Sequence, residues 1–161
     1  MDGLEESYQH TALAGVLWQP LKVIPTAGGP VLHLLRPGYA LMPYVKGFGE
    51  IYFSEVEAGQ VKGWKCHSKQ TQLFAVPFGT LKVVLYDDRG DSPSFGQIAE
   101  FTLGRPDNYG LLKIPPRIWY AFGALGGTAL LCNCADIPHD PNESAKLDLT
   151  DPAIPYHFPA S

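Results

Sequence analysis

The chain has 161 residues and a formal net charge of −4, with 45% hydrophobic and 17% charged residues. These values fit one globular domain over residues 1–161, which is large enough to bury a core. The acidic balance gives no reason to expect a nucleic acid or an anionic membrane as a partner. No apolar stretch approaches the ~20 residues that a membrane-spanning helix requires.

The N-terminus and the cysteines indicate the compartment. The first ten residues, MDGLEESYQH, are acidic and polar, whereas a secretory signal has a basic start followed by an apolar run. Three cysteines, Cys66, Cys132 and Cys134, cannot all pair with one another. We therefore expect a cytoplasmic protein with free thiols.

Short apolar runs separated by turn residues follow one another along the chain. The 17 glycines and 15 prolines argue against long helices, and no helical apolar period persists. One helical turn is expected near residues 142–145. Strands are predicted by β-branched and aromatic content before His67 and at 21–24, 31–35, 50–56, 72–76, 81–87, 98–103, 109–114, 119–125 and 128–135.

Two hairpins are expected in this series. The strands at 72–76 and 81–87 flank a turn at Pro77–Gly79, and the strands at 119–125 and 128–135 flank a Gly-Gly turn. Many short strands with frequent Gly and Pro turns predict an all-β fold, an antiparallel sandwich or barrel with little helix.

A set of residues occurs in a characteristic order in the C-terminal two thirds of the chain. The strand that ends in His67 is followed by Gln72–Leu73, Gly79, LKVVLYDDR at 81–89, SPSFG at 92–96, IPP at 114–116 and DPAI at 151–154. This set, over about residues 50–159, resembles the dTDP-4-dehydrorhamnose 3,5-epimerase family. The resemblance implies a cupin-like jelly roll, usually a homodimer, that acts on a nucleotide-linked 4-keto-6-deoxy sugar without a metal or other cofactor.

The implied chemistry is proton transfer at carbons next to a ketone. It needs a base, a group that polarises the ketone, and an acid on the opposite face of the sugar ring. By the resemblance, His67 stands at the position of the base. Asp151 stands at the position of the carboxylate that would hold the imidazole in one tautomer and raise its basicity.

Other positions of the family pattern carry different residues here. The family's acid, a tyrosine, falls on Cys132, and its second histidine falls on Tyr120. A family arginine falls on Trp64 and a family lysine on Gln72. The two tyrosines that stack on thymine in the family fall on Ile137 and Pro138. Trp64, Gln72 and Cys132 are therefore candidates for substrate binding. Because the usual acid is missing, inversion at only one carbon is a reasonable expectation.

Five residues could replace the missing groups. Tyr120 could donate a proton or a hydrogen bond to the ketone from its apolar strand. Lys82 lies on the face of residues 82, 84 and 86, which could line the barrel interior, where an ammonium would stabilise an enolate. Lys65, two residues before the histidine, could share its face and do the same. Arg89 and Lys113 are candidate phosphate contacts.

Structural explanations compete with these assignments. A lone histidine in a β-protein is more often structural or on the surface than catalytic, and Asp151 could simply form a turn before a proline. Cys132 and Cys134, two apart on one strand face, are typical of small buried apolar residues. Neither this pair nor Cys66–His67 has the spacing of a zinc site, so no metal is expected.

Three alternatives for the function therefore remain open. The first is a metal-independent epimerase or keto-isomerase of a nucleotide-linked 4-keto sugar, with His67 as base. The second is a cupin-fold sugar-binding or assembly protein without catalysis, and a metal-dependent cupin is a third alternative. Exchange of a substrate proton by His67 separates the first from the second.

Overall fold

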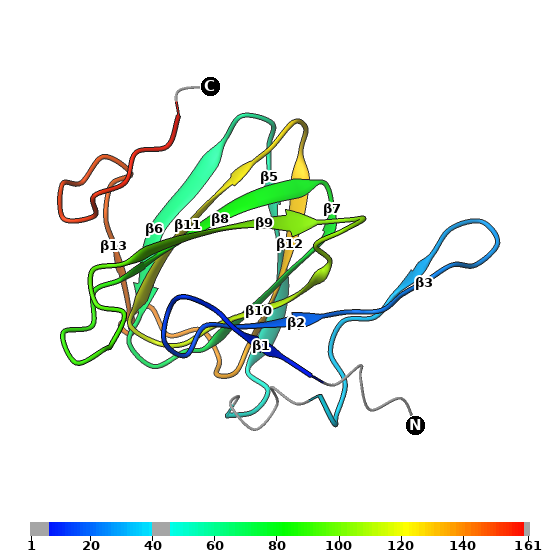
Figure 1. Ribbon diagram of the computed structural model, residues 1–161, viewed down its shortest axis with the longest axis horizontal. Helices are drawn as coiled ribbons and strands as arrows, with labels where there is room; N and C mark the ends of the chain where they lie inside the picture. The colour runs from blue at the N-terminus through cyan, green and yellow to red at the C-terminus, as the bar shows by residue number, and fades with distance from the viewer. Residues whose placement is uncertain (1–6, 40–45, 160–161) are drawn as a thin grey trace.

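The computed structural model describes residues 7–39 and 46–159. Over these residues the chain forms antiparallel strands and no helix, arranged as two sheets that face each other (Figure 1). The prediction of an all-β, cupin-like jelly roll is confirmed. No helix in the described part of the chain is long and apolar enough to cross a membrane.

The strands are distributed over two large sheets and a small ribbon. The six-stranded sheet has the order β1 (Gln9–His10), β2 (Leu17–Pro20), β10 (Gly110–Ile114), β7 (Gln72–Phe78), β12 (Ala129–Ala135) and β5 (Glu50–Val56). The five-stranded sheet has the order β13 (Ser144–Lys146), β6 (Val61–His67), β11 (Ile118–Ala124), β8 (Thr80–Asp87) and β9 (Ile98–Gly104). The ribbon, β3 (Val23–Ile24) with β4 (Val31–Leu32), projects from the body (Figure 1).

The predicted strands exist, but the two predicted hairpins are wrong in their pairing. β7 and β8 follow each other across Gly79, yet β7 pairs with β10 and β12 whereas β8 pairs with β11 and β9. β11 and β12 are divided between the sheets in the same way. Each short glycine turn carries the chain from one sheet to the other, so that the apolar faces of both strands meet in the core.

Two further local predictions are corrected. The helical turn expected near 142–145 is replaced by β13, because this segment pairs with the edge of β6, with Ser144 opposite His67. The face of β8 that points into the sandwich carries Leu81, Val83 and Leu85, and not the face that was predicted. Both faces of β8 are apolar, because the outer one is covered by the C-terminal segment, so alternation alone could not tell them apart.

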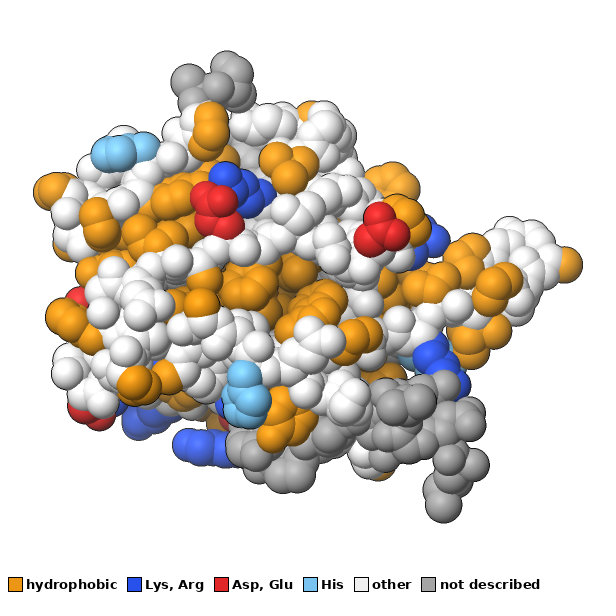
Figure 2. All heavy atoms as spheres, viewed as in Figure 1, with side chains coloured by type: hydrophobic (Ala, Val, Ile, Leu, Met, Phe, Trp, Pro, Cys, Tyr) orange, Lys and Arg blue, Asp and Glu red, His pale blue; other side chains and the backbone are white. Residues whose placement is uncertain are grey.

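Figure 2 shows hydrophobic side chains over the middle of one face and along the projecting ribbon. On the ribbon these include Val23, Ile24 and Val31, of which Val31 is 50% exposed. A two-stranded ribbon alone is marginally stable in water. The main core lies instead between the large sheets, and two smaller apolar clusters lie on their outer faces.

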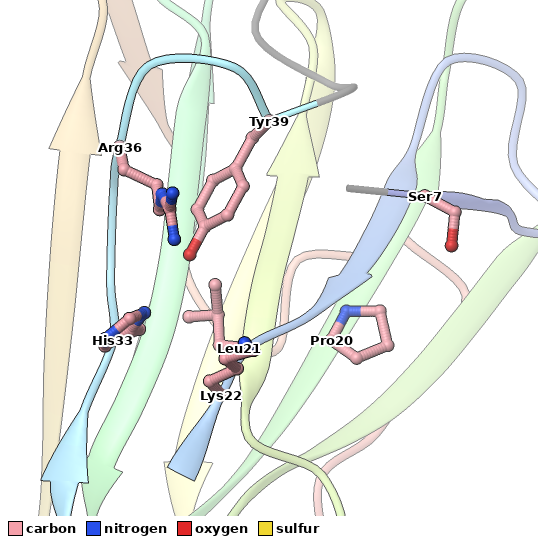
Figure 3. Close-up of a pocket in the computed structure, with 7 residues that line it drawn as sticks. All are labelled: Ser7, Pro20, Leu21, Lys22, His33, Arg36 and Tyr39. Carbon is pink, nitrogen blue, oxygen red and sulfur yellow. The ribbon is translucent and has the colours of Figure 1, made fainter. Parts of the chain in front are cut away.

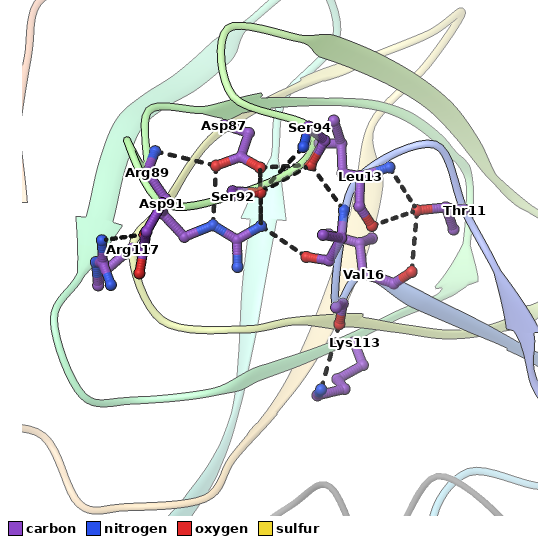
Figure 4. A network of polar contacts seen from close by, with 12 residues as sticks. Thr11, Leu13, Val16, Asp87, Arg89, Asp91, Ser92, Ser94, Lys113 and Arg117 are labelled. Atoms are coloured by element: carbon purple, nitrogen blue, oxygen red, sulfur yellow. Dashed lines mark hydrogen bonds and ion pairs between the residues drawn. The ribbon is translucent and has the colours of Figure 1, made fainter.

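A buried polar network joins the N-terminal segment to the loop after β8 (Figure 4). The Asp87 carboxylate is fully buried and accepts hydrogen bonds from Arg89 Nε and Nη2, both at 2.8 Å, and from the hydroxyls of Ser92 and Ser94. Arg89 Nη2 also donates to the carbonyl oxygen of Ala14 at 2.6 Å. Burial raises the pKa of Asp87, but these hydrogen bonds outweigh it and hold the pKa well below its ordinary value. The network ties the end of β8, in the five-stranded sheet, to the segment between β1 and β2 of the six-stranded sheet.

Candidate active site

A cavity of about 170 Å³ lies between the two large sheets. Its lining comes from both of them, with β5, β7 and β12 on one side and β6 and β11 on the other. A few polar groups converge on mostly apolar walls, which is typical of a small-molecule site. The lining residues are Tyr52, Ser54, Gly63, Lys65, Phe74, Tyr120, Phe122 and Leu131.

A chain of three polar side chains ends at this cavity. His67, the last residue of β6, makes a hydrogen bond through Nδ1 to Oε1 of Glu143. Its Nε2 lies 3.0 Å from the hydroxyl oxygen of Tyr120 on the neighbouring strand β11. His67 is 4% exposed and lies behind Tyr120, so that the phenol and not the imidazole lines the cavity.

Glu143 is held as a carboxylate in this chain. Its Oε2 accepts hydrogen bonds from the backbone N–H groups of Lys69 at 3.1 Å and Gln70 at 3.2 Å. Burial raises the pKa of Glu143, but the hydrogen bonds from His67 and from the two backbone groups outweigh it and leave the pKa below its ordinary value. At neutral pH the Glu143 carboxylate therefore accepts a hydrogen bond from the N–H group at Nδ1 of the imidazole.

The protonation of the other two members follows. Burial lowers the pKa of His67, and the contact with Glu143 offsets this only in part, so the imidazole is neutral at pH 7. With its proton on Nδ1, its Nε2 accepts the hydroxyl proton of Tyr120. Burial raises the pKa of Tyr120, which keeps the phenol protonated. The chain is thus arranged to carry a proton from the cavity toward Nε2.

A second polar chain lies in the opposite sheet. Asn133 of β12 accepts a hydrogen bond from the backbone N–H of Leu73 at 3.2 Å, which fixes the orientation of its amide. Its Nδ2 then donates to the hydroxyl oxygen of Tyr52 at 2.9 Å and to Oε1 of Gln72. The Gln72 amide in turn donates to Oε1 of Gln70 at 2.7 Å. These buried amides position Tyr52 on the wall of the cavity.

Lys65 brings positive charge to the cavity. It lies two residues before His67 on the same face of β6 and opposite Tyr120 in the register with β11, as alternation predicts. Burial and the nearby charge of Lys146 lower the pKa of Lys65 below its ordinary value. An ammonium here can stabilise negative charge that develops on a ligand.

Comparison with solved structures identifies the group to which this arrangement belongs. A dTDP sugar isomerase from Desulfovibrio desulfuricans G20 is 52% identical, with a TM-score of 0.87, over 92% of this chain and 93% of that one. The chain belongs to the dTDP-4-dehydrorhamnose 3,5-epimerase family. Members of this family are sugar epimerases and isomerases. A dTDP-4-dehydrorhamnose 3,5-epimerase from Bacillus anthracis shares the fold at 20% identity, with a TM-score of 0.83 over 96% of this chain and 91% of that one.

Two curated relatives match part of the chain. The probable low-salt glycan biosynthesis epimerase Agl13 of Haloferax volcanii is 37% identical over 76 residues, 47% of this chain and 48% of that protein. The spore coat polysaccharide biosynthesis protein SpsL of Bacillus subtilis is 37% identical over 83 residues, 52% of this chain and 54% of that protein. In these matches the chain spans about half the length of each relative. No family model matches it.

This member of the family differs from the sequence prediction in the carboxylate that contacts the histidine. The predicted contact between Asp151 and His67 is wrong, since Glu143 lies on Nδ1 and Tyr120 on Nε2. Asp151 instead accepts a hydrogen bond from the backbone N–H of Ala153 at 2.9 Å, as a turn-forming residue does. Sequence reasoning missed Glu143, which lies in an irregular segment whose only signal is that it precedes a short strand.

Two other predicted residues lie away from the cavity. Lys82 is on the outer face of β8, where its ammonium is 3.0 Å from Glu100 and lies over the ring of Tyr156, so its predicted place in the interior is wrong. Trp64 is buried on the outer face of its sheet against Tyr156 and Phe158. With Asp151, Trp64 lines a groove of about 670 Å³ along β6 and β13.

The remaining candidates are structural in their contacts. Cys132 and Cys134 are buried in the cluster on the outer face of the six-stranded sheet, whereas the intervening Asn133 points inward. Gln72 does not line the cavity but supports Asn133. Arg89 donates to Asp87 and does not line the cavity, and its predicted contact with a phosphate stays a prediction. Lys113 is 7% exposed and donates to the carbonyl oxygen of Gly15 at 3.2 Å.

A pocket of about 220 Å³ lies outside the sandwich, beside the projecting ribbon (Figure 3). Its lining includes Lys22, His33 and Arg36, and the Arg36 guanidinium lies 6.0 Å from the ring centre of Tyr39. The six-stranded sheet separates it from the cavity of Tyr120, so it is not part of the candidate active site. Within residues 7–39 and 46–159, no three His, Cys, Asp or Glu side chains are grouped to hold a metal ion.

Proposed function

We propose that this protein is an epimerase or keto-isomerase of a dTDP-linked 4-keto-6-deoxy sugar in deoxy-sugar or glycan biosynthesis. The observation that carries the proposal is the buried chain from Glu143 through His67 to Tyr120, which ends at the cavity between the two large sheets. Its support from relatives is the similarity to a dTDP sugar isomerase over most of both chains. A carbon next to a ketone is acidic enough for a positioned side chain to remove its proton.

In this mechanism His67 is the final proton acceptor. The substrate C–H bond breaks, its proton passes to the oxygen of Tyr120, and the phenol releases its own proton to Nε2 of His67. The imidazolium that forms is stabilised by the carboxylate of Glu143. Lys65 stabilises the enolate on the substrate.

The reaction as proposed requires no metal. Both ring nitrogens of His67 are engaged, one by Glu143 and the other by Tyr120, so the imidazole has no lone pair left for a metal ion. Lys65 supplies positive charge where the enolate develops. Activity that is unchanged after exhaustive chelation is the expected result, and activity restored only by an added metal would contradict it.

The test is deuterium wash-in followed by NMR. The protein is incubated in heavy water with dTDP-linked 4-keto-6-deoxy sugars, in parallel with His67→Asn. Exchange at C3, C5 or both, lost in the variant, is the expected result. A folded protein that binds the sugar nucleotide without exchange would be a binding protein, and exchange that survives His67→Asn would remove His67 from the mechanism.

We also propose that the protein is a cytoplasmic homodimer. Ile51 and Phe53 are 47% and 63% exposed on β5, the last strand of its sheet among the described residues, and an apolar edge of this kind favours pairing with a second copy. The cysteines of the described residues are free thiols, which suits a reducing compartment. A monomer by light scattering, or recovery outside the cytoplasm on cell fractionation, would contradict the respective proposal.

A further inference from the structure

We propose that Tyr52 is a second catalytic residue, which donates a proton to the substrate from the wall opposite Tyr120. The inference rests on the proposed function, since it concerns how the same cavity inverts a carbon. Inversion requires that the proton leaves one face of the sugar ring and returns to the other. One proton-transferring chain therefore accounts for only half of the reaction.

The positions of the two phenols meet this requirement. Tyr120 comes from β11 in the five-stranded sheet and Tyr52 from β5 in the six-stranded sheet, and both line the cavity between the sheets. Burial is the main cause that raises the pKa of Tyr120, and the charge that Tyr52 would carry if ionised is the second cause. This second effect reflects how near the two phenols lie. A sugar ring held in this cavity has one phenol on each side.

The hydrogen bonding of Tyr52 leaves its own proton available. Leu73 fixes the Asn133 amide so that its Nδ2 faces Tyr52, and the phenol oxygen therefore accepts this hydrogen bond. Among the described residues Tyr52 donates no hydrogen bond in return. Burial raises the pKa of Tyr52 above its ordinary value, although the hydrogen bond from Asn133 opposes this, so the phenol carries its proton at neutral pH.

The two phenols are also placed for opposite roles. Tyr120 is 4% exposed and contacts a neutral imidazole that can accept its proton, so it serves the removal of the substrate proton. Tyr52 is 38% exposed, so water can reach it and restore the proton that it gives away. The geometry therefore separates a base side, backed by His67, from an acid side, backed by Asn133.

The second half of the reaction then balances. The O–H bond of Tyr52 breaks and a C–H bond forms at the enolate carbon, on the face opposite the one that lost its proton. The resulting phenolate is stabilised by the amide of Asn133 and takes a proton from water. The imidazolium of His67 releases its proton to water, and the protein returns to its initial state without an oxidant or reductant.

The test separates proton exchange from inversion. Wild-type protein and Tyr52→Phe are incubated with a dTDP-linked 4-keto-6-deoxy sugar in heavy water, and deuterium content and configuration are followed by NMR. Tyr52→Phe should keep exchange within about 3-fold, because the base side is intact, and should lose inversion by ~10²-fold or more, as expected for a missing general acid. Glu55→Gln, which alters an exposed residue of the same strand that does not line the cavity, is the matched control and should change neither rate by more than about 3-fold.

Two results with Tyr52→Phe would overturn the inference alone. Inversion at the wild-type rate in Tyr52→Phe would show that the phenol donates no proton. Equal loss of exchange and inversion, in a variant with wild-type melting temperature and substrate affinity, would assign Tyr52 to proton removal instead. A wild-type protein that exchanges no proton with any such sugar would overturn the proposed function and this inference with it, and the wild-type arm alone reveals that case.

Discussion

Glu143→Gln is the substitution that tests the proposed proton chain most directly. Gln can keep one oxygen toward the backbone N–H groups of Lys69 and Gln70, but it presents an NH₂ group to Nδ1 of His67. Two donors cannot face each other, so the imidazole must move its proton to Nε2. Nε2 then donates to Tyr120 and can no longer accept the phenol proton.

The size of the effect follows from this change of tautomer. Loss of general-base catalysis costs ~10²–10⁴ in rate. At about 1.36 kcal/mol for each factor of ten, the barrier rises by about 2.7–5.4 kcal/mol. The fold should survive, because exchanging a charge-assisted hydrogen bond for a neutral one costs about 1–2 kcal/mol, against a total stability of about 5–15 kcal/mol.

The assay combines the rate of deuterium wash-in with the ¹⁵N spectrum of the His67 ring, which reports the tautomer directly. Asp151→Asn is the matched control, because Asn can still accept the hydrogen bond from Ala153 at the same turn. Its exchange rate should stay within about 3-fold of wild type. A full rate in Glu143→Gln, or a loss confined to Asp151→Asn, would refute the assignment of Glu143 as the carboxylate that positions His67.

Three further predictions concern pH and stability. The rate of exchange should rise with pH through a midpoint below 6.5, because burial lowers the pKa of His67 and only the neutral imidazole accepts a proton; a pH–rate profile with a midpoint above 6.5 would contradict this. Asp87→Ala should lower the free energy of unfolding by about 3–5 kcal/mol in urea titrations at pH 7, because Arg89 loses its buried partner. Since the folded pKa of Asp87 is depressed, its contribution is complete above pH ~4 and is lost as the pH falls further, so the two proteins should converge in acid, and a constant difference would count against it. Gly79→Ala should cost at least ~1–2 kcal/mol, because Gly79 has φ +73 and an added Cβ would lie 2.6 Å from the Cα of Ala129; an unchanged melting temperature would contradict this.

The strands could be predicted from the sequence because each has a local signal. β5 begins and ends at the predicted residues, and the other long strands differ from prediction by at most about two residues. Pairing has no such local signal. The turn at Gly79 looks the same whether the next strand turns back on its neighbour or crosses to the facing sheet, and only the packing of the whole core decides between them.

The candidate site was predictable in the same uneven way. Alternation puts Lys65 and His67 on one face, and the register of β6 with β11 brings Tyr120 to them. Lys82 was misplaced because the outer face of β8 is as apolar as the inner one. Residues 147–158 cover this outer face, and they lie sixty or more positions further along the chain than β8.

The pairing of β13 explains why Glu143, and not the predicted Asp151, contacts His67. This strand pairs with β6 so that Ser144 stands opposite His67, and the carbonyl oxygen of Glu143 accepts the backbone N–H of Ser68 at 2.7 Å. The pairing fixes the residue before β13 next to the imidazole. Asp151, seven residues beyond Ser144, lies past the end of the strand and lines the groove of Trp64 instead. The choice of carboxylate therefore depends on the register of a three-residue edge strand, which neither composition nor motif spacing encodes.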